Sequence, residues 1–220
     1  MISVSDYVGD LMPAAAAASS ANTQSLSSAV KQWLETNPGR KLDEETAIKL
    51  MCTSPPIDKI DNSVNAFTSC IQLSLSTNCI DKIPLLPRSG LPKLEILSLG
   101  RNQLKKITGL EEVGATLREL WVSYNQISTL DGLNCCLKLQ TLFISNNKIK
   151  DIAEVKKLTL NLSLTNCNLI NNPIYDTGAN KAETRHSILK TVPNLQVLDG
   201  ELVTESERGR SSHSARQAVA

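Results

Sequence analysis

An asparagine recurs along the middle of the chain at nearly constant spacing, and apolar residues occupy fixed positions around it. The steps between successive copies are 24, 23, 22 and 25 residues. Leu, Ile, Val or Cys stands eight, five and three residues before each copy, and Ile or Leu stands two residues after it. The five anchor asparagines of this pattern are Asn78, Asn102, Asn125, Asn147 and Asn172. The middle of the chain is therefore an internal repeat.

The alternation of apolar and polar residues before each anchor predicts a short strand with one buried face. The apolar residues after the anchor suit a short helical return. One such coil cannot bury its apolar side alone, but stacking the next coil on it can. The pattern L-x-x-L-x-L-x-x-N-x-L at this period is that of a leucine-rich repeat. A partial copy follows at residues 195–200. We predict an α/β solenoid of about six leucine-rich repeats with a parallel, concave β-sheet and a helical cap at each end.

Two residue types within the frame have a predicted role in the interior. Each anchor asparagine is expected to turn inward, where its amide can pair with backbone groups that the turn leaves unsatisfied. Cys70 and Cys167 replace leucine at core positions of the frame, so we expect both thiols to be buried as small apolar groups.

The segments that flank the repeats predict capping helices, which an array needs to cover its apolar ends. Residues 26–34 have apolar side chains at helical spacing, and Trp33 among them is expected to cover the first repeat. A second helix is predicted over residues 43–51, ended by two prolines, and Ile57 to Ile60 is expected to be the tail of a degenerate first repeat.

The C-terminal cap is predicted as a helix that begins at Asn180 and ends at Pro193. A further short helix is predicted from Thr204, with Glu207 three residues later. The resulting organisation is an arm of low complexity, an N-terminal helical cap, the repeats, a C-terminal cap with the last partial repeat, and a tail. These segments span residues 1–22, 23–56, 57–178, 179–203 and 204–220.

The polar positions of the strands point away from the core, onto the open face of the predicted sheet. On that face the frame places Trp121 beside Phe143 of the next strand, within a small and polar surround. An exposed aromatic pair of this kind resembles an interaction hot spot, although the two rings could also simply stack on each other. The predicted partner-binding residues are Trp121, Phe143, Ile96, Ser98, Glu119, Ser123, Tyr124, Thr141, Ser145 and Asn168. In the tail, Glu201, Thr204 and Arg208 are candidates for further contacts, the alternative being a tail that faces solvent.

Composition and charge give no indication of a nucleic-acid partner, a membrane partner or a membrane-spanning segment. The net charge is +1, so charge gives no reason to expect nucleic acid or a membrane surface as a partner. No apolar run approaches the roughly 20 residues that span a bilayer, and the N-terminus does not read as a secretory signal. The six cysteines form no C-x-x-C pair, which favours reduced thiols in a cytosolic protein.

Catalytic motifs are missing from the sequence. It contains no Walker loop, no G-x-G-x-x-G, no H-E-x-x-H and no G-x-S-x-G. The two histidines, His186 and His213, lie in the predicted cap helix and the tail, where a surface histidine is the ordinary interpretation. We expect a protein that is not an enzyme, with no cofactor and no metal.

With the repeats laid out, the sequence resembles the axonemal outer-arm dynein light chain 1 family, the leucine-rich-repeat light chains of that motor. The resemblance rests on motifs that are specific in order and spacing over about residues 47 to 203. These motifs are PPIDKID, LSLSTNCIDKI, LEILSLGRNQLKKI, LRELWVSYNQI, ISNNKIKD, NNPIYD and VPNLQVLDG. The N-terminal arm, the segment LNLSLTNCNLINNPIY and the tail after Leu202 depart from the family pattern.

The resemblance implies a non-catalytic subunit that binds a dynein heavy chain at its microtubule-binding stalk region, close to tubulin. It also implies that the subunit tunes motor activity in the axoneme of a cilium or flagellum. By position, Trp121 and Phe143 would contact the heavy chain, and residues 201–210 correspond to a projecting C-terminal helix. Two other adaptors use repeats of this subclass and remain as alternatives: a regulatory subunit of a protein phosphatase and a spliceosomal repeat protein.

Overall fold

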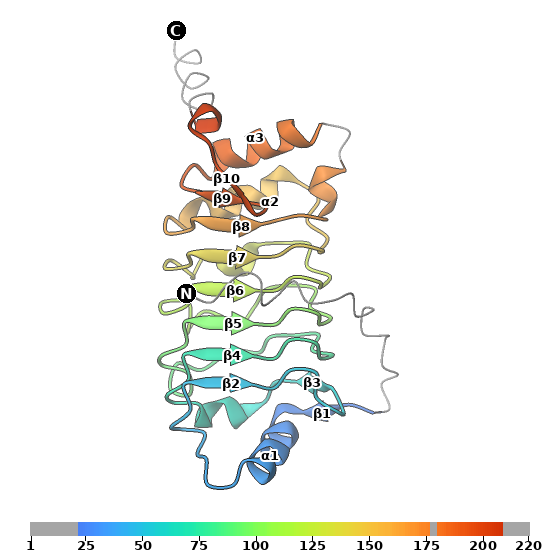
Figure 1. The fold of residues 1–220 in the computed structure, drawn as a ribbon, viewed down its shortest axis with the longest axis vertical. Coiled ribbons are helices and arrows are strands. Elements are labelled where there is room, and N and C mark those ends of the chain that lie inside the picture. Colours follow the sequence, from blue (N-terminus) through green and yellow to red (C-terminus); the bar gives the residue numbers. More distant parts are fainter. Residues whose placement is uncertain (1–21, 177–179, 209–220) are drawn as a thin grey trace.

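The computed structural model describes residues 22–176 and 180–208, and it has the predicted architecture of stacked coils (Figure 1). Each coil contributes one short strand to a single sheet with the order β10-β9-β8-β7-β6-β5-β4-β2. All neighbours pair in parallel except the terminal pair of β9 and β10. The strands are β2 (Ala47–Lys49), β4 (Gln72–Ser74), β5 (Ile96–Ser98), β6 (Glu119–Trp121), β7 (Thr141–Phe143), β8 (Asn166–Asn168), β9 (Val197–Leu198) and β10 (Glu201–Leu202).

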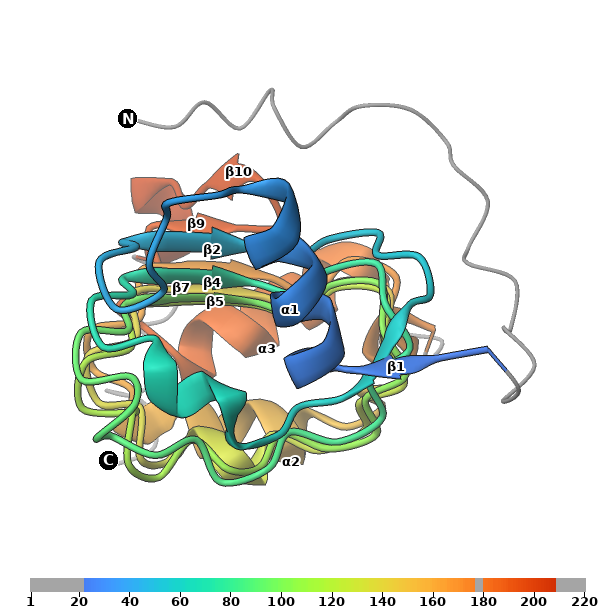
Figure 2. The same ribbon diagram turned by 90° about the horizontal axis from the view of Figure 1, so that it is seen from below.

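The returns of the coils lie opposite the sheet, as the view along the stack shows (Figure 2). They contain helix α2 (Ile152–Lys156) and several short 3₁₀ helices. The 3₁₀ helices span Asn62–Ala66, Asp131–Leu133, Lys157–Leu160 and Pro173–Tyr175. Helix α3 (Lys181–Thr191) lies at the C-terminal end of the stack (Figure 1).

The core fills the space between the sheet and the returns. Its side chains are the apolar positions of the repeat frame, and the leucines of the strands, such as Leu97, Leu120 and Leu142, have no exposed surface. Cys70 and Cys167 are buried among them, as predicted, and burial raises the pKa of both thiols; that of Cys70 rises to about 11. Burying each large aliphatic side chain contributes about 1.5–3 kcal/mol, so the stacked leucines provide the main driving force for the fold.

The anchor asparagines confirm the predicted inward role, and each joins its own coil to the coil before it. The Asn125 amide nitrogen donates to Leu99 O and Val122 O at 3.0 Å each. Its oxygen accepts the Leu104 N–H at 2.9 Å. The side chains of Asn78, Asn102, Asn147 and Asn172 make the equivalent bonds in their own coils.

The helix predicted over residues 43–51 is wrong, because this segment forms the first strand of the sheet. Strand β2 pairs with β4, and Ile48 lies opposite Leu73 in the same buried row. The anchor of this coil is Thr53, whose hydroxyl donates to the Asn78 side-chain oxygen at 2.8 Å. The predicted N-terminal cap therefore contains a full strand, and the sheet has seven parallel strands where about six repeats were predicted.

The helix predicted at residues 26–34 is confirmed as α1 (Leu26–Thr36), which begins at the N-cap residue Ser25. Just before it, β1 (Gln24–Ser25) pairs with β3 (Ile57–Lys59), the tail of the first coil. Leu26 is fully buried, and Trp33 is half-buried against the core with the Arg40 guanidinium 5.2 Å from its ring centre. The predicted arm lies outside the described residues apart from Asn22.

Replacing one anchor asparagine tests whether these amides hold the coils together. In Asn125→Ala the buried Leu104 N–H loses its acceptor, and the Leu99 and Val122 carbonyls each lose one of two amide donors, so we expect the free energy of unfolding in urea titrations to fall by about 2–4 kcal/mol. Asn134→Ala removes an exposed amide from an outer turn and should change stability by less than about 0.5 kcal/mol. Equal effects of the two substitutions would contradict the structural role of the anchor.

Candidate protein-binding face

The sheet presents the polar positions of its strands on one open face, and the largest side chains on it are an aromatic pair, Trp121 and Phe143. Both are half-buried, whereas Leu120 and Leu142 between the face residues are fully buried. Trp121 of β6 pairs in register with Phe143 of β7. Their ring centres are 4.6 Å apart with an interplanar angle of 86°, an edge-to-face contact. The indole is thus on the face, as predicted, and is also packed on its neighbour.

Glu119 and Thr141 flank the aromatic pair on the same face, and both are half-buried. The Glu119 carboxylate accepts the Trp121 indole N–H at 3.0 Å. This bond and the edge-to-face contact together fix the orientation of the indole before any partner arrives. A pre-oriented aromatic side chain loses little conformational freedom on binding.

The other predicted face residues differ in how much surface they offer. Ile96 and Asn168 are half-buried, and the Asn168 side chain accepts the Ile170 N–H at 3.1 Å. Ser123 and Ser145 share a hydrogen bond of 2.9 Å and are also half-buried.

Ser98 lacks the exposed surface expected of a partner-binding residue. It is only 3% exposed, and its hydroxyl is hydrogen-bonded to that of Ser76 at 2.7 Å. Its small side chain lies next to Trp121 in the sheet register. Ser98 can therefore offer almost no surface to a partner.

Tyr124 lies just beyond the end of β6 and is 47% exposed. The Arg101 guanidinium of the previous coil stacks on its ring, 4.2 Å from the ring centre. Tyr124 is among the predicted partner-binding residues, whereas Arg101 is not. The signal for Arg101 was available, because it holds the same position before its anchor asparagine as Tyr124 does.

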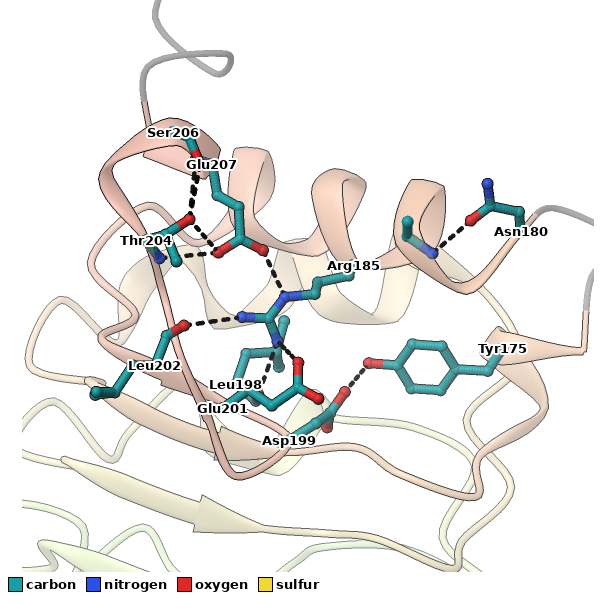
Figure 3. Close-up of polar contacts among 11 residues, drawn as sticks. Tyr175, Asn180, Arg185, Leu198, Asp199, Glu201, Leu202, Thr204, Ser206 and Glu207 are labelled. Carbon is teal, nitrogen blue, oxygen red and sulfur yellow. Dashed lines mark hydrogen bonds and ion pairs between the residues drawn. The ribbon is translucent and has the colours of Figure 1, made fainter.

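All three candidate residues of the tail make contacts within the chain, and Figure 3 shows those of Glu201 and Thr204. Glu201 lies 3.7 Å from the Arg185 guanidinium, and the Arg208 guanidinium donates to Leu195 O at 3.2 Å. Thr204 begins a short helix over residues 205–208 and exchanges bonds with Glu207, which confirms the predicted cap. The first part of the tail is therefore attached to the C-terminal cap, and residues 209–220 lie outside the described residues.

Arg185 of α3 makes this attachment. Its side chain is 13% exposed, and its guanidinium donates to Glu207 at 2.7 Å and to Leu198 O at 2.8 Å. Beside it, the Tyr175 hydroxyl donates to Asp199. The predicted cap helix itself is confirmed as α3, with Asn180 as N-cap and Ile188, Leu189 and Val192 buried.

The described part of the chain, residues 22–176 and 180–208, has no group of three or more His, Cys, Asp or Glu side chains that could hold a metal ion. Within the same residues, no helix is long and apolar enough to span a membrane. His186 is half-buried on α3, while His213 falls outside them.

The fold and this face define a leucine-rich-repeat protein. A family model described as "Leucine Rich repeats (2 copies)" matches residues 68–112 and 115–157. Similar proteins of known name identify the family within the leucine-rich-repeat class. The chain is 40% identical over 194 residues to dynein axonemal light chain 1 of Danio rerio, which covers 88% of this chain and 100% of the relative. Identity to the protein of the same name from Chlamydomonas reinhardtii is 43% over 172 residues, covering 77% and 86%. The chain belongs to the dynein axonemal light chain 1 family.

Solved structures support the same fold at lower identity. One is the Drosophila melanogaster SNF/U2A′ complex, with a TM-score of 0.57 and 19% identity over 66% of this chain and 84% of the matched chain. A leucine-rich-repeat protein of Leptospira interrogans has a TM-score of 0.53 and 22% identity over 77% and 46%. At these identities the likeness concerns the fold alone.

The attachment of the tail predicts a pH dependence. Hydrogen bonding to Arg185 lowers the pKa of Glu207 from 4.5 to about 2. Because the folded state holds this carboxylate at a lower pKa than the unfolded chain, its contribution to stability is present above about pH 4.5 and is lost as the pH falls toward 2. Glu207→Gln should therefore lower the melting temperature by about 2–4 °C at pH 6, and this difference should disappear near pH 2.

Glu205→Gln is the matched control, since Glu205 is exposed and outside the ion pairs of the described residues. It should leave the melting temperature unchanged at both pH values. A Glu207→Gln difference that persists at low pH would show that the carboxylate charge is not its origin.

Proposed function

We propose that the protein is a non-catalytic light chain of axonemal outer-arm dynein, and that its open face binds a dynein heavy chain in the microtubule-binding stalk region. The bound light chain lies close to tubulin and tunes the motility of a cilium or flagellum. Membership of the dynein axonemal light chain 1 family supports the association with dynein and the location in the axoneme. The choice of the stalk region rests on the resemblance of the sequence motifs.

The observation that carries the proposed contact is the aromatic pair on the open face. Two large rings, Trp121 and Phe143, are held in a fixed edge-to-face contact at 4.6 Å while both retain exposed surface. Trp is enriched at hot spots, and rings that are already oriented bury apolar area at low entropic cost. A groove-docked amphipathic helix is a suitable partner, because it offers a row of apolar side chains to a shallow surface.

The two alternative adaptors receive less support. The spliceosomal comparison rests on 19% identity, against 40% or more for the axonemal light chains. The face residues Trp121 and Tyr124 also fall within the motif LRELWVSYNQI, on which the resemblance to the axonemal family depends.

Removing the aromatic pair tests the proposal. In the double variant Trp121→Ala with Phe143→Ala, binding to purified axonemal dynein should weaken by about 100-fold or more, since each hot-spot truncation commonly costs about 2 kcal/mol. The far-UV circular dichroism spectrum should be unchanged, because the strand backbones and the leucine core remain.

The matched control is Leu137→Ala with Leu162→Ala, which removes two large apolar side chains that are 59% and 71% exposed away from the sheet strands. Its affinity for dynein should stay within about twofold of the wild type. If the aromatic variant also retained wild-type affinity, the heavy chain would have to bind elsewhere on the molecule.

A further inference from the structure

The residue before each anchor has a left-handed backbone, and two coils fill this position with bulky side chains. The φ angles are 55° at Arg101 and 58° at Tyr124, and they are 53° at Cys52, 57° at Thr77, 55° at Asn146 and 57° at Asn171 in the other coils. Asparagine tolerates this conformation, whereas long or aromatic side chains adopt it less readily. Because the turn imposes this backbone on every coil, it holds the Arg101 and Tyr124 side chains in fixed positions at the end of the strands.

Arg101 is held in place by stacking and not by an ion pair. Its guanidinium lies 4.2 Å from the centre of the Tyr124 ring. In the described ranges, residues 22–176 and 180–208, the salt bridges involve other arginines, and no hydrogen bond from the Arg101 guanidinium is present. A planar guanidinium fixed on an aromatic ring has its N–H donors oriented for a bidentate acceptor, with little further entropy to lose.

A row of small residues separates this stack from the aromatic pair. The row, which we call the serine floor, consists of Gly100, Ser123 and Ser145, each two residues before its anchor. A Cβ atom on Gly100 would lie 3.3 Å from Ser123 O, so a larger residue would crowd this part of the floor. On the far side of the aromatic pair lies Glu119. The face thus has an acidic group at one margin and a basic group at the other.

We propose that Arg101, oriented by Tyr124, binds a carboxylate of the heavy-chain segment that docks on the aromatic pair. This inference rests on the proposed function and names the chemistry of the partner. The segment has apolar side chains that cover Trp121 and Phe143, and an Asp or Glu that reaches over the serine floor to Arg101. Charge complementarity selects this partner, because a guanidinium fork matches a carboxylate bidentately. Arginine and aromatic residues together are also the usual composition of a hot spot.

Arg101→Asn separates a binding role from a structural one. Asparagine suits the left-handed backbone, so this variant should melt about 2–4 °C higher than the wild type. Its affinity for purified axonemal dynein should nevertheless fall about 10-fold, mainly through faster dissociation, and the salt dependence of binding should become weaker. A residue with only a structural role would not give higher stability together with lower affinity. Lys105→Asn, which removes an exposed charge of the same sign from the outer turn, should bind as the wild type does.

The other outcomes decide between the two proposals. If Arg101→Asn binds within about twofold of the wild type while the Trp121 and Phe143 double variant does not bind, the carboxylate contact is wrong and the proposed face stands. If neither set of substitutions weakens binding, the open face is not the dynein site and both proposals fail. Dynein treated with a phosphatase should bind unchanged, and loss of binding after this treatment would assign the anion as a phosphoryl group, which overturns the carboxylate assignment.

Discussion

The structure depends on the fact that no single coil can bury its own apolar side chains or pair its own buried backbone groups. Each strand is three residues or fewer, so a single coil has neither enough apolar surface nor enough hydrogen-bond partners to fold alone. The leucines solve the first problem by burying their side chains against the neighbouring coils. The anchor asparagines solve the second, because one amide such as that of Asn125 serves carbonyls of two coils and an N–H of the earlier one. Stability and cooperativity therefore come from contacts between coils.

This constraint also shapes the open face. Because the strands are locked in register, residues at equivalent positions of successive coils stand side by side at a spacing of about 4.8 Å. Trp121 and Phe143 meet for this reason, and so do Arg101 and Tyr124 at the turn. The same turn forces a left-handed residue into every coil, so the side chains displayed there are held on a rigid backbone. The solenoid is a support that presents fixed side chains, in keeping with a family whose members are light chains of a motor.

The repeated part of the fold could be predicted from the sequence, because five coils keep the asparagine and leucine frame intact. The first coil could not, because Thr53 replaces the anchor asparagine and two prolines follow it, so that Ile48 and Leu50 were attributed to a helix. On the face, the alternation of the strands located Trp121 and Phe143. The alternation does not show how far each side chain is buried, which is why Ser98 was expected to be accessible. The stacking of Arg101 on Tyr124 and the ion pairs of Arg185 join separate coils and segments, and spacing along the chain does not reveal such contacts.

If the open face binds dynein as proposed, the aromatic pair becomes covered in the complex. Hydroxyl-radical footprinting with mass spectrometry tests this directly, because the chain has two tryptophans in different places. Trp121 lies on the open face, and Trp33 lies on α1 at the opposite end of the stack from the C-terminal cap (Figure 1). Saturation with axonemal dynein should suppress oxidation of Trp121 and leave that of Trp33 unchanged. Undiminished oxidation of Trp121 in the saturated complex would contradict the proposed binding to the open face.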